Sequence, residues 1–144
     1  MSEWVYCDTS AMAKRYVRER GRAVLLHLLA RRRVVSSVVM PVELHSVFSR
    51  RERDGSLAAT ALPRLYQRVA ADREHWTLVE TTREVLAEAE ALLESHALRT
   101  ADALHVASAR VFQRRLQVRV CFVSADARQL AAASREGLVV KAIV

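Results

Sequence analysis

The sequence contains few of the residues that interrupt or cross-link a chain: three glycines, two prolines and two cysteines among 144 residues. With so little Gly and Pro and with 51% hydrophobic residues, a sizeable disordered or low-complexity segment is excluded. The two cysteines, Cys7 and Cys121, lie within apolar runs, and neither has the spacing of a metal ligand. We therefore expect free, buried thiols in the reducing cytoplasm.

Long hydrophobic runs do not occur either. No stretch reaches the roughly 18 apolar residues that cross a membrane, and the first residues lead into a strand-like run instead of a signal peptide. These features predict a cytoplasmic protein without membrane association. The length fits a single domain over residues 1–144, which buries enough surface to fold without a disulfide or a metal.

Positive charge exceeds negative charge, since 23 Lys and Arg against 16 Asp and Glu give a net charge of +7. Most of the excess is arginine, clustered at 31–33, 50–51 and 114–115. The guanidinium group matches the geometry of phosphate, so this balance favours a polyanionic substrate. For any single cluster, a solvated surface in a protein from a GC-biased genome is the alternative.

Apolar, β-branched runs alternate with helical patterns along the whole chain. Strands are expected at 3–8, 34–39, 76–80, 119–124 and 138–144, and helices begin near residues 11, 22, 41, 62, 83, 100 and 125. Thr9 or Ser10 is the expected cap of the first helix. This alternation predicts an α/β fold with helices on both faces of a mainly parallel sheet.

Four carboxylates stand at strand ends or helix starts of this pattern. They are Asp8, Glu43, Asp102 and Asp126. The last two lie two residues past a hydroxyl residue, Thr100 or Ser124, that is a candidate N-cap. Helices that follow parallel strands begin at the carboxyl edge of the sheet, where ligands bind in such folds. The four acids are therefore expected at one edge.

Packing four carboxylates together is costly unless a cation compensates their charge. A helix N-terminus offsets only ~0.3–1 kcal/mol for each acid, whereas Mg²⁺ or Mn²⁺ bound by oxygens is sufficient. Each acid also has an ordinary alternative: Asp102 and Asp126 as helix-start residues, Asp8 in an Asx-turn, and Glu43 paired with Arg50.

The segments around the acids resemble those of the PIN-domain ribonucleases, specifically the VapC-type toxins of bacterial toxin–antitoxin pairs. They are Asp8-Thr9-Ser10-Ala11, Pro41-Val42-Glu43-Leu44, Thr100-Ala101-Asp102-Ala103-Leu104-His105 and Ser124-Ala125-Asp126. They occur in the family's order and span the whole chain. The sequence departs from the family at Ser124, where threonine is usual, and at Arg128, where some relatives carry another acid.

The resemblance implies a three-layer α/β/α sandwich with a five-stranded sheet in the order 3-2-1-4-5. It further implies a Mg²⁺- or Mn²⁺-dependent endoribonuclease, the toxin of a type II pair, that hydrolyses RNA to leave a 3′-hydroxyl and a 5′-phosphate. The expected partners are the RNA substrate, a second copy of the chain in a homodimer, and a small VapB-like antitoxin whose C-terminal arm enters the acidic site.

Specific roles follow for individual residues. Asp8 and Asp102 are expected to be direct metal ligands and Asp126 a third, while Glu43 is expected to orient or deprotonate water one shell out. Supporting hydrogen bonds are expected from hydroxyl groups, and contacts to RNA or to the partner from arginines. The supporting residues are Ser10, Thr100 and Ser124, and the arginines are Arg99 and Arg50. His105 is expected to be a structural, hydrogen-bonded histidine.

Three other functions compete with this interpretation. A phospho-receiver domain also collects acids at a sheet edge, with a lysine near the fifth strand such as Lys141, but it needs two adjacent acids after strand one, and Thr9 follows Asp8. A PIN-type RNA-processing nuclease without a toxin role has the same site. A non-catalytic binding module would not need the intact acids.

Overall fold

The computed structural model describes residues 2–144 and contains a five-stranded sheet in the order β3-β2-β1-β4-β5. Its strands are β1 (Trp4–Cys7), β2 (Arg33–Ser37), β3 (Thr77–Val79), β4 (Val120–Ser124) and β5 (Val139–Ala142). All four strand pairings are parallel, with Val5 of β1 opposite Val34 of β2 and Cys121 of β4. The predicted α/β class and strand order are confirmed.

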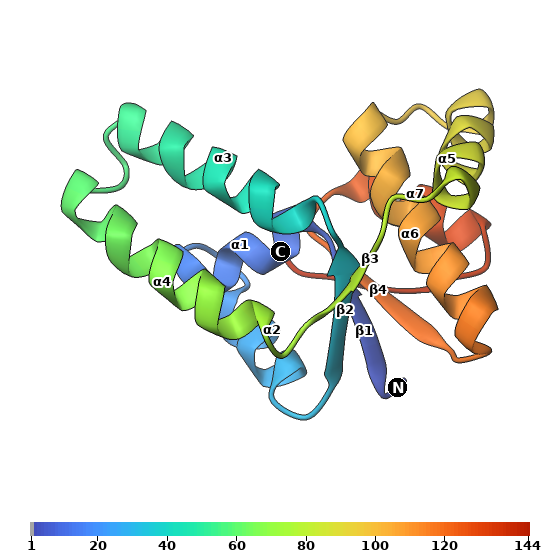
Figure 1. Cartoon of the computed structure of the whole chain (residues 1–144), viewed down its shortest axis with the longest axis horizontal. Helices are drawn as coiled ribbons and strands as arrows, with labels where there is room; N and C mark the ends of the chain where they lie inside the picture. Colours follow the sequence, from blue (N-terminus) through green and yellow to red (C-terminus); the bar gives the residue numbers. More distant parts are fainter. Residues whose placement is uncertain (1) are drawn as a thin grey trace.

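Helices cover both faces of this sheet (Figure 1). One face carries α1 (Thr9–Tyr16), α2 (Arg22–Leu29), α3 (Met40–Arg53) and α4 (Leu62–Arg73), the last preceded by a 3-10 turn at Ala59–Ala61. The other face carries α5 (Arg83–Ser95), α6 (Thr100–Leu116) and α7 (Ala127–Arg135). This three-layer arrangement is the one expected for buried parallel strands, because both faces of the central strands are apolar.

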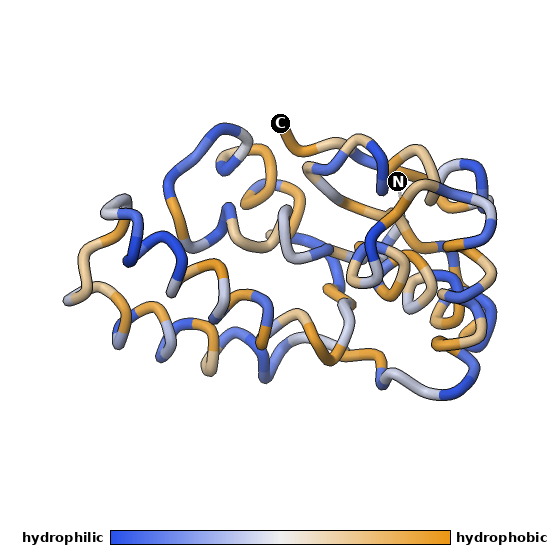
Figure 2. Tube along the Cα trace, turned by 90° about the horizontal axis from the view of Figure 1, so that it is seen from above, coloured by the Kyte–Doolittle hydropathy of each residue, from blue (hydrophilic) through white to orange (hydrophobic). Residues whose placement is uncertain are grey.

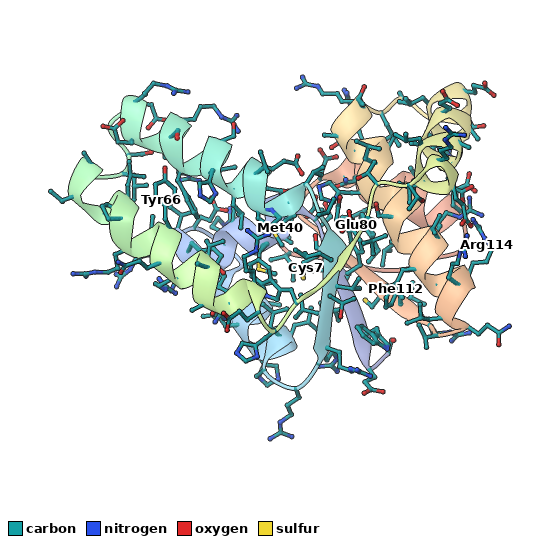
Figure 3. All side chains as sticks on the ribbon, in the orientation of Figure 1. Cys7, Met40, Tyr66, Glu80, Phe112 and Arg114 are labelled. Carbon is teal, nitrogen blue, oxygen red and sulfur yellow. The ribbon has the colours of Figure 1, made fainter. Side chains whose placement is uncertain are left out.

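The sheet separates two hydrophobic cores. Cys7 and Met40 belong to the core beneath α1–α4, and Phe112 belongs to the core beneath α5–α7 (Figure 3). Every residue of β1 and β4 is buried, and hydrophobic stretches of the tube in Figure 2 alternate with hydrophilic ones along the surrounding helices. Both cysteines are buried and free, as expected. No helix within residues 2–144 is long and apolar enough to span a membrane.

The strands at the two sheet edges are shorter than predicted. β3 covers Thr77–Val79 instead of 76–80, and β5 covers Val139–Ala142 instead of 138–144. The central strand β1 is also shorter than predicted, Trp4–Cys7 instead of 3–8, but an edge strand differs in having a partner on one side only. Val139 and Val140 are accordingly 44% and 36% exposed despite their strand-forming character.

Candidate active site

A cavity of about 420 Å³ lies at the carboxyl edge of the sheet, lined by residues from the beginnings of α1, α3 and α6. The four acids that the sequence places at this edge all line it: Asp8, Glu43, Asp102 and Asp126. They come from the end of β1, the first turn of α3, the first turn of α6 and the start of α7. Strands β1 and β4 are neighbours at the centre of the sheet, where the strand order reverses.

Asp8 is the most deeply buried of the four, with 3% of its surface exposed. Its carboxylate accepts hydrogen bonds from the Ala11 backbone N–H at 2.9 Å, from Ser10 Oγ at 2.7 Å and from Ser124 Oγ at 2.8 Å. Burial raises the pKa of Asp8 above its ordinary value, although the nearby His105 and these donors oppose the shift. The bonds orient the carboxylate without neutralising it.

Asp8 itself is the N-cap of α1, which corrects the prediction that Thr9 or Ser10 caps this helix. An N-cap residue has extended backbone, and Asp8, with φ −74° and ψ 174°, has it, while Thr9 is already helical. The two hydroxyl residues are thereby free for other contacts. Ser10 bonds to Asp8, and Thr9 bonds to Glu43.

Asp102 and Asp126 begin two neighbouring helices. Asp126 is the N-cap of α7 and accepts bonds from the backbone N–H groups of Arg128 and Gln129, whereas Asp102 lies in the first turn of α6 and accepts from the Arg99 backbone N–H at 3.4 Å. The predicted N-caps Thr100 and Ser124 are wrong, because Arg99 caps α6 and Ser124 still belongs to β4. Burial and then the charge of Asp126 raise the pKa of Asp102.

Glu43 is held by a hydroxyl group and an imidazole, and not by an arginine. Its Oε1 accepts from Thr9 Oγ1 at 2.8 Å and lies 2.7 Å from His105 Nε2. Burial is the largest single influence and would raise the pKa of Glu43, but the hydrogen bond and charge of His105 and the hydrogen bond from Thr9 together outweigh it, so the pKa falls below its usual value. Arg50, the alternative partner, lines the same cavity and forms no ion pair with Glu43 within the described chain.

A second hollow of about 770 Å³ adjoins the first and shares Asp102, Asp126 and Arg99 with it. Arg128 and the apolar residue Leu98 complete its walls together with Ala97, from the segment between α5 and α6, and Ala127, the first residue of α7. Asp102 and Asp126 therefore lie between two concave surfaces, whereas Asp8 and Glu43 line only the first. Each surface carries at least one exposed guanidinium group.

Two residues named from the sequence lie away from this arrangement. Thr100 is exposed at the start of α6 and does not line either hollow, so among the three predicted supporting hydroxyl groups only those of Ser10 and Ser124 reach an acid. Lys141 is in β5 and does not line the cavity. The lysine that a phospho-receiver site requires is therefore not found beside Asp8.

The side chains of the cavity suit a hard divalent cation by their chemistry. All four acids offer oxygen ligands, and no Lys or Arg within residues 2–144 forms an ion pair with Asp8, Asp102 or Asp126. Across the same residues, no group of three or more acidic, His or Cys side chains is already arranged to hold one ion. Mg²⁺ commonly keeps several waters and takes only one or two carboxylates, so the donor set fits it. The predicted set of three direct ligands stays a prediction.

Besides the contact of His105 with Glu43, two further sets of contacts at the site were not foreseen from the sequence. Gln129 is 1% exposed and links Ser124 to the backbone oxygen of Asp102, and Thr9 bonds to Glu43, 34 residues away. The position of Gln129 on the apolar side of a short helix was the available signal for a buried polar group. Nothing local marks the contact of Thr9, because it depends on how α3 packs on α1.

Comparison with known proteins gives a consistent result. A family model described as PIN domain matches residues 5–135. Solved structures with a similar fold include FitAcB from Neisseria gonorrhoeae, with TM-score 0.70, 14% identity, and coverage of 94% of this chain and 95% of that one. A toxin–antitoxin complex from Klebsiella pneumoniae has TM-score 0.62, 12% identity, and coverage of 88% and 90%.

A third structure, VapBC-5 from Mycobacterium tuberculosis, belongs to the VapBC family of toxin–antitoxin systems. It has TM-score 0.59, 16% identity, and coverage of 98% of both chains. At such low identity these structures establish the fold alone. The search of curated proteins gave no match.

Proposed function

Because the chain belongs to the PIN-domain family, whose members are nucleases, we propose that it is a Mg²⁺- or Mn²⁺-dependent endoribonuclease and the toxin of a toxin–antitoxin pair. One observation carries the proposal: four carboxylates from separate parts of the chain line one cavity, and the most buried of them, Asp8, has no cationic partner among residues 2–144. A protein does not retain such a charge for stability, since an uncompensated buried carboxylate is destabilising. Perturbed acids in a cleft are typical of a catalytic site.

In this proposal a bound divalent cation would supply charge neutralisation at the scissile phosphate and a more acidic water. Asp8 and Asp102 would hold it, and Asp126 is the third candidate ligand. Ser10 and Ser124 keep the carboxylate of Asp8 in one orientation, because each donates to it from a buried or half-buried position.

Glu43 serves as the proton acceptor. Its lowered pKa keeps it ionised at neutral pH, so it can take a proton from water while the water oxygen bonds to phosphorus. The bond between phosphorus and the 3′ oxygen breaks, the 3′ oxygen takes up a proton from solvent water, and Glu43 returns its proton to solvent. The products are a 3′-hydroxyl and a 5′-phosphate.

RNA is the proposed substrate because the acids are bordered by guanidinium groups. Arg50 and Arg99 line the acidic cavity, and Arg128 lines the adjoining hollow. A phosphate backbone that crosses the acids would therefore meet an arginine on each side. The net charge of +7 favours association with any polyanion over long range.

A small antitoxin is the proposed inhibitor. It would bring a C-terminal arm into the acidic cavity, where an arginine could pair with the carboxylates that are not neutralised within the chain. The similar structures from Klebsiella pneumoniae and Mycobacterium tuberculosis, described as toxin–antitoxin proteins, support this part of the proposal. A homodimer and a cytoplasmic location are proposed on the family resemblance.

The test is RNA cleavage by the purified protein. With Mg²⁺ or Mn²⁺ the wild type should cut total RNA, and Asp8→Ala and Asp102→Ala should reduce cleavage by at least 10²-fold, whereas Glu90→Gln, an exposed acid of α5, should leave it unchanged. Cleavage that persists in EDTA would exclude the metal-dependent mechanism.

The toxin role is tested separately in growing cells. Expression of the wild type should stop growth, and Asp8→Ala should relieve the arrest. Co-expression of the small protein encoded beside it should also restore growth. Cleavage without growth arrest would favour an RNA-processing nuclease instead.

A further inference from the structure

His105 is a buried side chain of the cavity whose two ring nitrogens both have hydrogen-bond partners. Its side chain is 3% exposed, it lies one turn after Asp102 in α6, and both ring nitrogens face protein oxygens. Nδ1 lies 2.8 Å from the hydroxyl of Tyr6, and Nε2 lies 2.7 Å from Glu43 Oε1 and 3.2 Å from Thr9 Oγ1. With both nitrogens engaged, the imidazole is not available as a metal ligand.

The two contacts fix which nitrogen carries the proton. Glu43 is ionised and can only accept, so Nε2 must be the donor in the 2.7 Å contact. In a neutral imidazole Nδ1 is then an acceptor, and the hydroxyl of Tyr6 must donate to it. Glu43 thus selects the tautomer with the proton on Nε2, and Tyr6 supplies the donor that this tautomer needs at Nδ1.

Tyr6 is well suited to hold this ring. It is fully buried in the central strand β1, its ring stacks on Phe122 with 5.3 Å between centroids, and it meets His105 edge-on at 5.8 Å. Burial raises the pKa of Tyr6 well above its usual value, so the phenol keeps its proton. A rigid donor inside the sheet therefore supports a rigid imidazole in the cavity wall.

Glu43, the third residue of this hydrogen-bonded series, is only half buried. The side chain of Glu43 is 29% exposed, and both the bond from Thr9 and the bond from His105 go to Oε1. Oε2 is consequently the oxygen left to face the cavity. One oxygen is used for anchoring, and the other is presented to solvent.

We propose that Tyr6, His105 and Glu43 form a relay in which the first two are positioning residues that hold the Glu43 carboxylate with Oε2 towards the reacting water. This inference rests on the proposed nuclease function and names the groups that control its proton acceptor. In the catalytic triad of serine hydrolases, a carboxylate orients an imidazole. Here the roles are exchanged, because the imidazole orients the carboxylate. Any buried histidine needs partners for its ring nitrogens, but here one of those partners is a carboxylate that lines the cavity.

The experiment measures kcat and KM for an RNA substrate in single and double variants. His105→Leu removes the bond to Glu43 and should lower kcat by about 10- to 100-fold with little change in KM, as losses of orienting groups do. His105→Gln can still donate to Glu43 and should recover at least part of this loss. Tyr6→Phe removes only the hydroxyl and should lower kcat by about 3- to 10-fold.

The double variant separates positioning from general stability. If His105 acts through Glu43, His105→Leu should cause no further loss of kcat in a Glu43→Ala background. Multiplying losses would overturn the proposal. The matched control is His96→Leu, because His96 also pairs with a glutamate, Glu136 Oε1 at 3.0 Å, outside the cavity. This variant should be less stable with an unchanged kcat.

A readout without catalysis completes the test. Nitrogen NMR of ¹⁵N-histidine-labelled protein should show His105 protonated at Nε2, and a proton on Nδ1 alone would overturn the proposal. A wild type that cuts no RNA would overturn the proposed function and the inference together. Cleavage by the wild type with an unchanged kcat in His105→Leu would overturn only the inference.

Discussion

Gln129 of α7 donates a hydrogen bond from Nε2 to the backbone oxygen of Asp102 in α6, 3.3 Å away. Its Oε1 accepts from Ser124 at the end of β4, so one side chain with 1% exposure joins a strand end and two helix starts. Asp102 and Asp126 are carried by those helix starts. Gln129 therefore sets how closely the two acids approach each other.

Replacing Gln129 by methionine should disturb the acids while nearly preserving volume. The loss of two buried hydrogen bonds should cost about 1–3 kcal/mol of stability, and the affinity for Mn²⁺ should fall by about 10-fold or more. Thermal unfolding and a Mn²⁺ titration measure the two effects. Gln113→Met is the control, because Gln113 bonds to the Val120 backbone N–H away from the cavity. It should lose stability and keep its Mn²⁺ affinity.

The α/β class and the meeting of the four acids could be predicted, because they follow from the hydrophobic period and from the rule that parallel strands end at one edge. The strand order was implied only by the resemblance to the PIN-domain ribonucleases. The helix starts could not be predicted to the residue. Thr9, Ser10 and Thr100 are all good caps in isolation, but Asp8 and Arg99 have the extended backbone that an N-cap needs. The bonds from Gln129 and Thr9 connect separate elements, so no local pattern reports them.

Gly21 precedes α2 with φ +88°, and a Cβ built there would lie 2.8 Å from Ile143 Cγ2 and 3.2 Å from the backbone oxygen of Val144. Gly21→Ala should therefore destabilise the protein by both backbone strain and collision, by about 2–4 kcal/mol in total. Gly55→Ala isolates the first effect, because Gly55 has φ +84° and nothing within 4 Å. Denaturant unfolding should give Gly21→Ala the clearly larger loss, and equal losses would exclude a role for the contact with the C-terminal segment.

Asp8→Asn should stabilise the metal-free protein at neutral pH. Because burial raises the pKa of Asp8, the folded chain binds its proton more tightly than the unfolded chain does. The contribution of Asp8 to the free energy of unfolding is fully present below the ordinary Asp pKa of about 3.9. It is lost as the pH rises through the pKa of Asp8 in the folded state. Asparagine avoids the loss, so we expect a gain of about 1 kcal/mol, or about 3 °C in melting temperature, at pH 7.

The measurement is a series of melting curves in EDTA between pH 4 and pH 8. The advantage of Asp8→Asn over the wild type should shrink as the pH falls, and an advantage that is constant with pH would contradict the assignment to the carboxylate. Mn²⁺ at about 100 times its dissociation constant should stabilise the wild type by about 2.7 kcal/mol. Asp8→Asn should show little of this effect.

Arg128→Ala should weaken RNA binding without impairing the chemical step. Arg128 lines the hollow beside Asp102 and Asp126, yet its guanidinium group is exposed, so its contribution is charge offered to a phosphate. We expect KM for RNA to rise by about 3- to 10-fold with kcat nearly unchanged, as loss of uniform binding does. The slope of log K against log salt concentration should become shallower by about 0.7, the value for one phosphate contact to a single strand.

Arg53→Ala controls for net charge, because Arg53 is equally exposed but lies at the far end of α3 and lines neither hollow. It removes the same charge from the protein and should leave the slope unchanged. Equal effects of the two substitutions would mean that RNA responds to the overall charge of +7 and not to the hollow beside the acids. A selective effect of Arg128→Ala would instead place the substrate backbone across the start of α7, next to the carboxylate of Asp126.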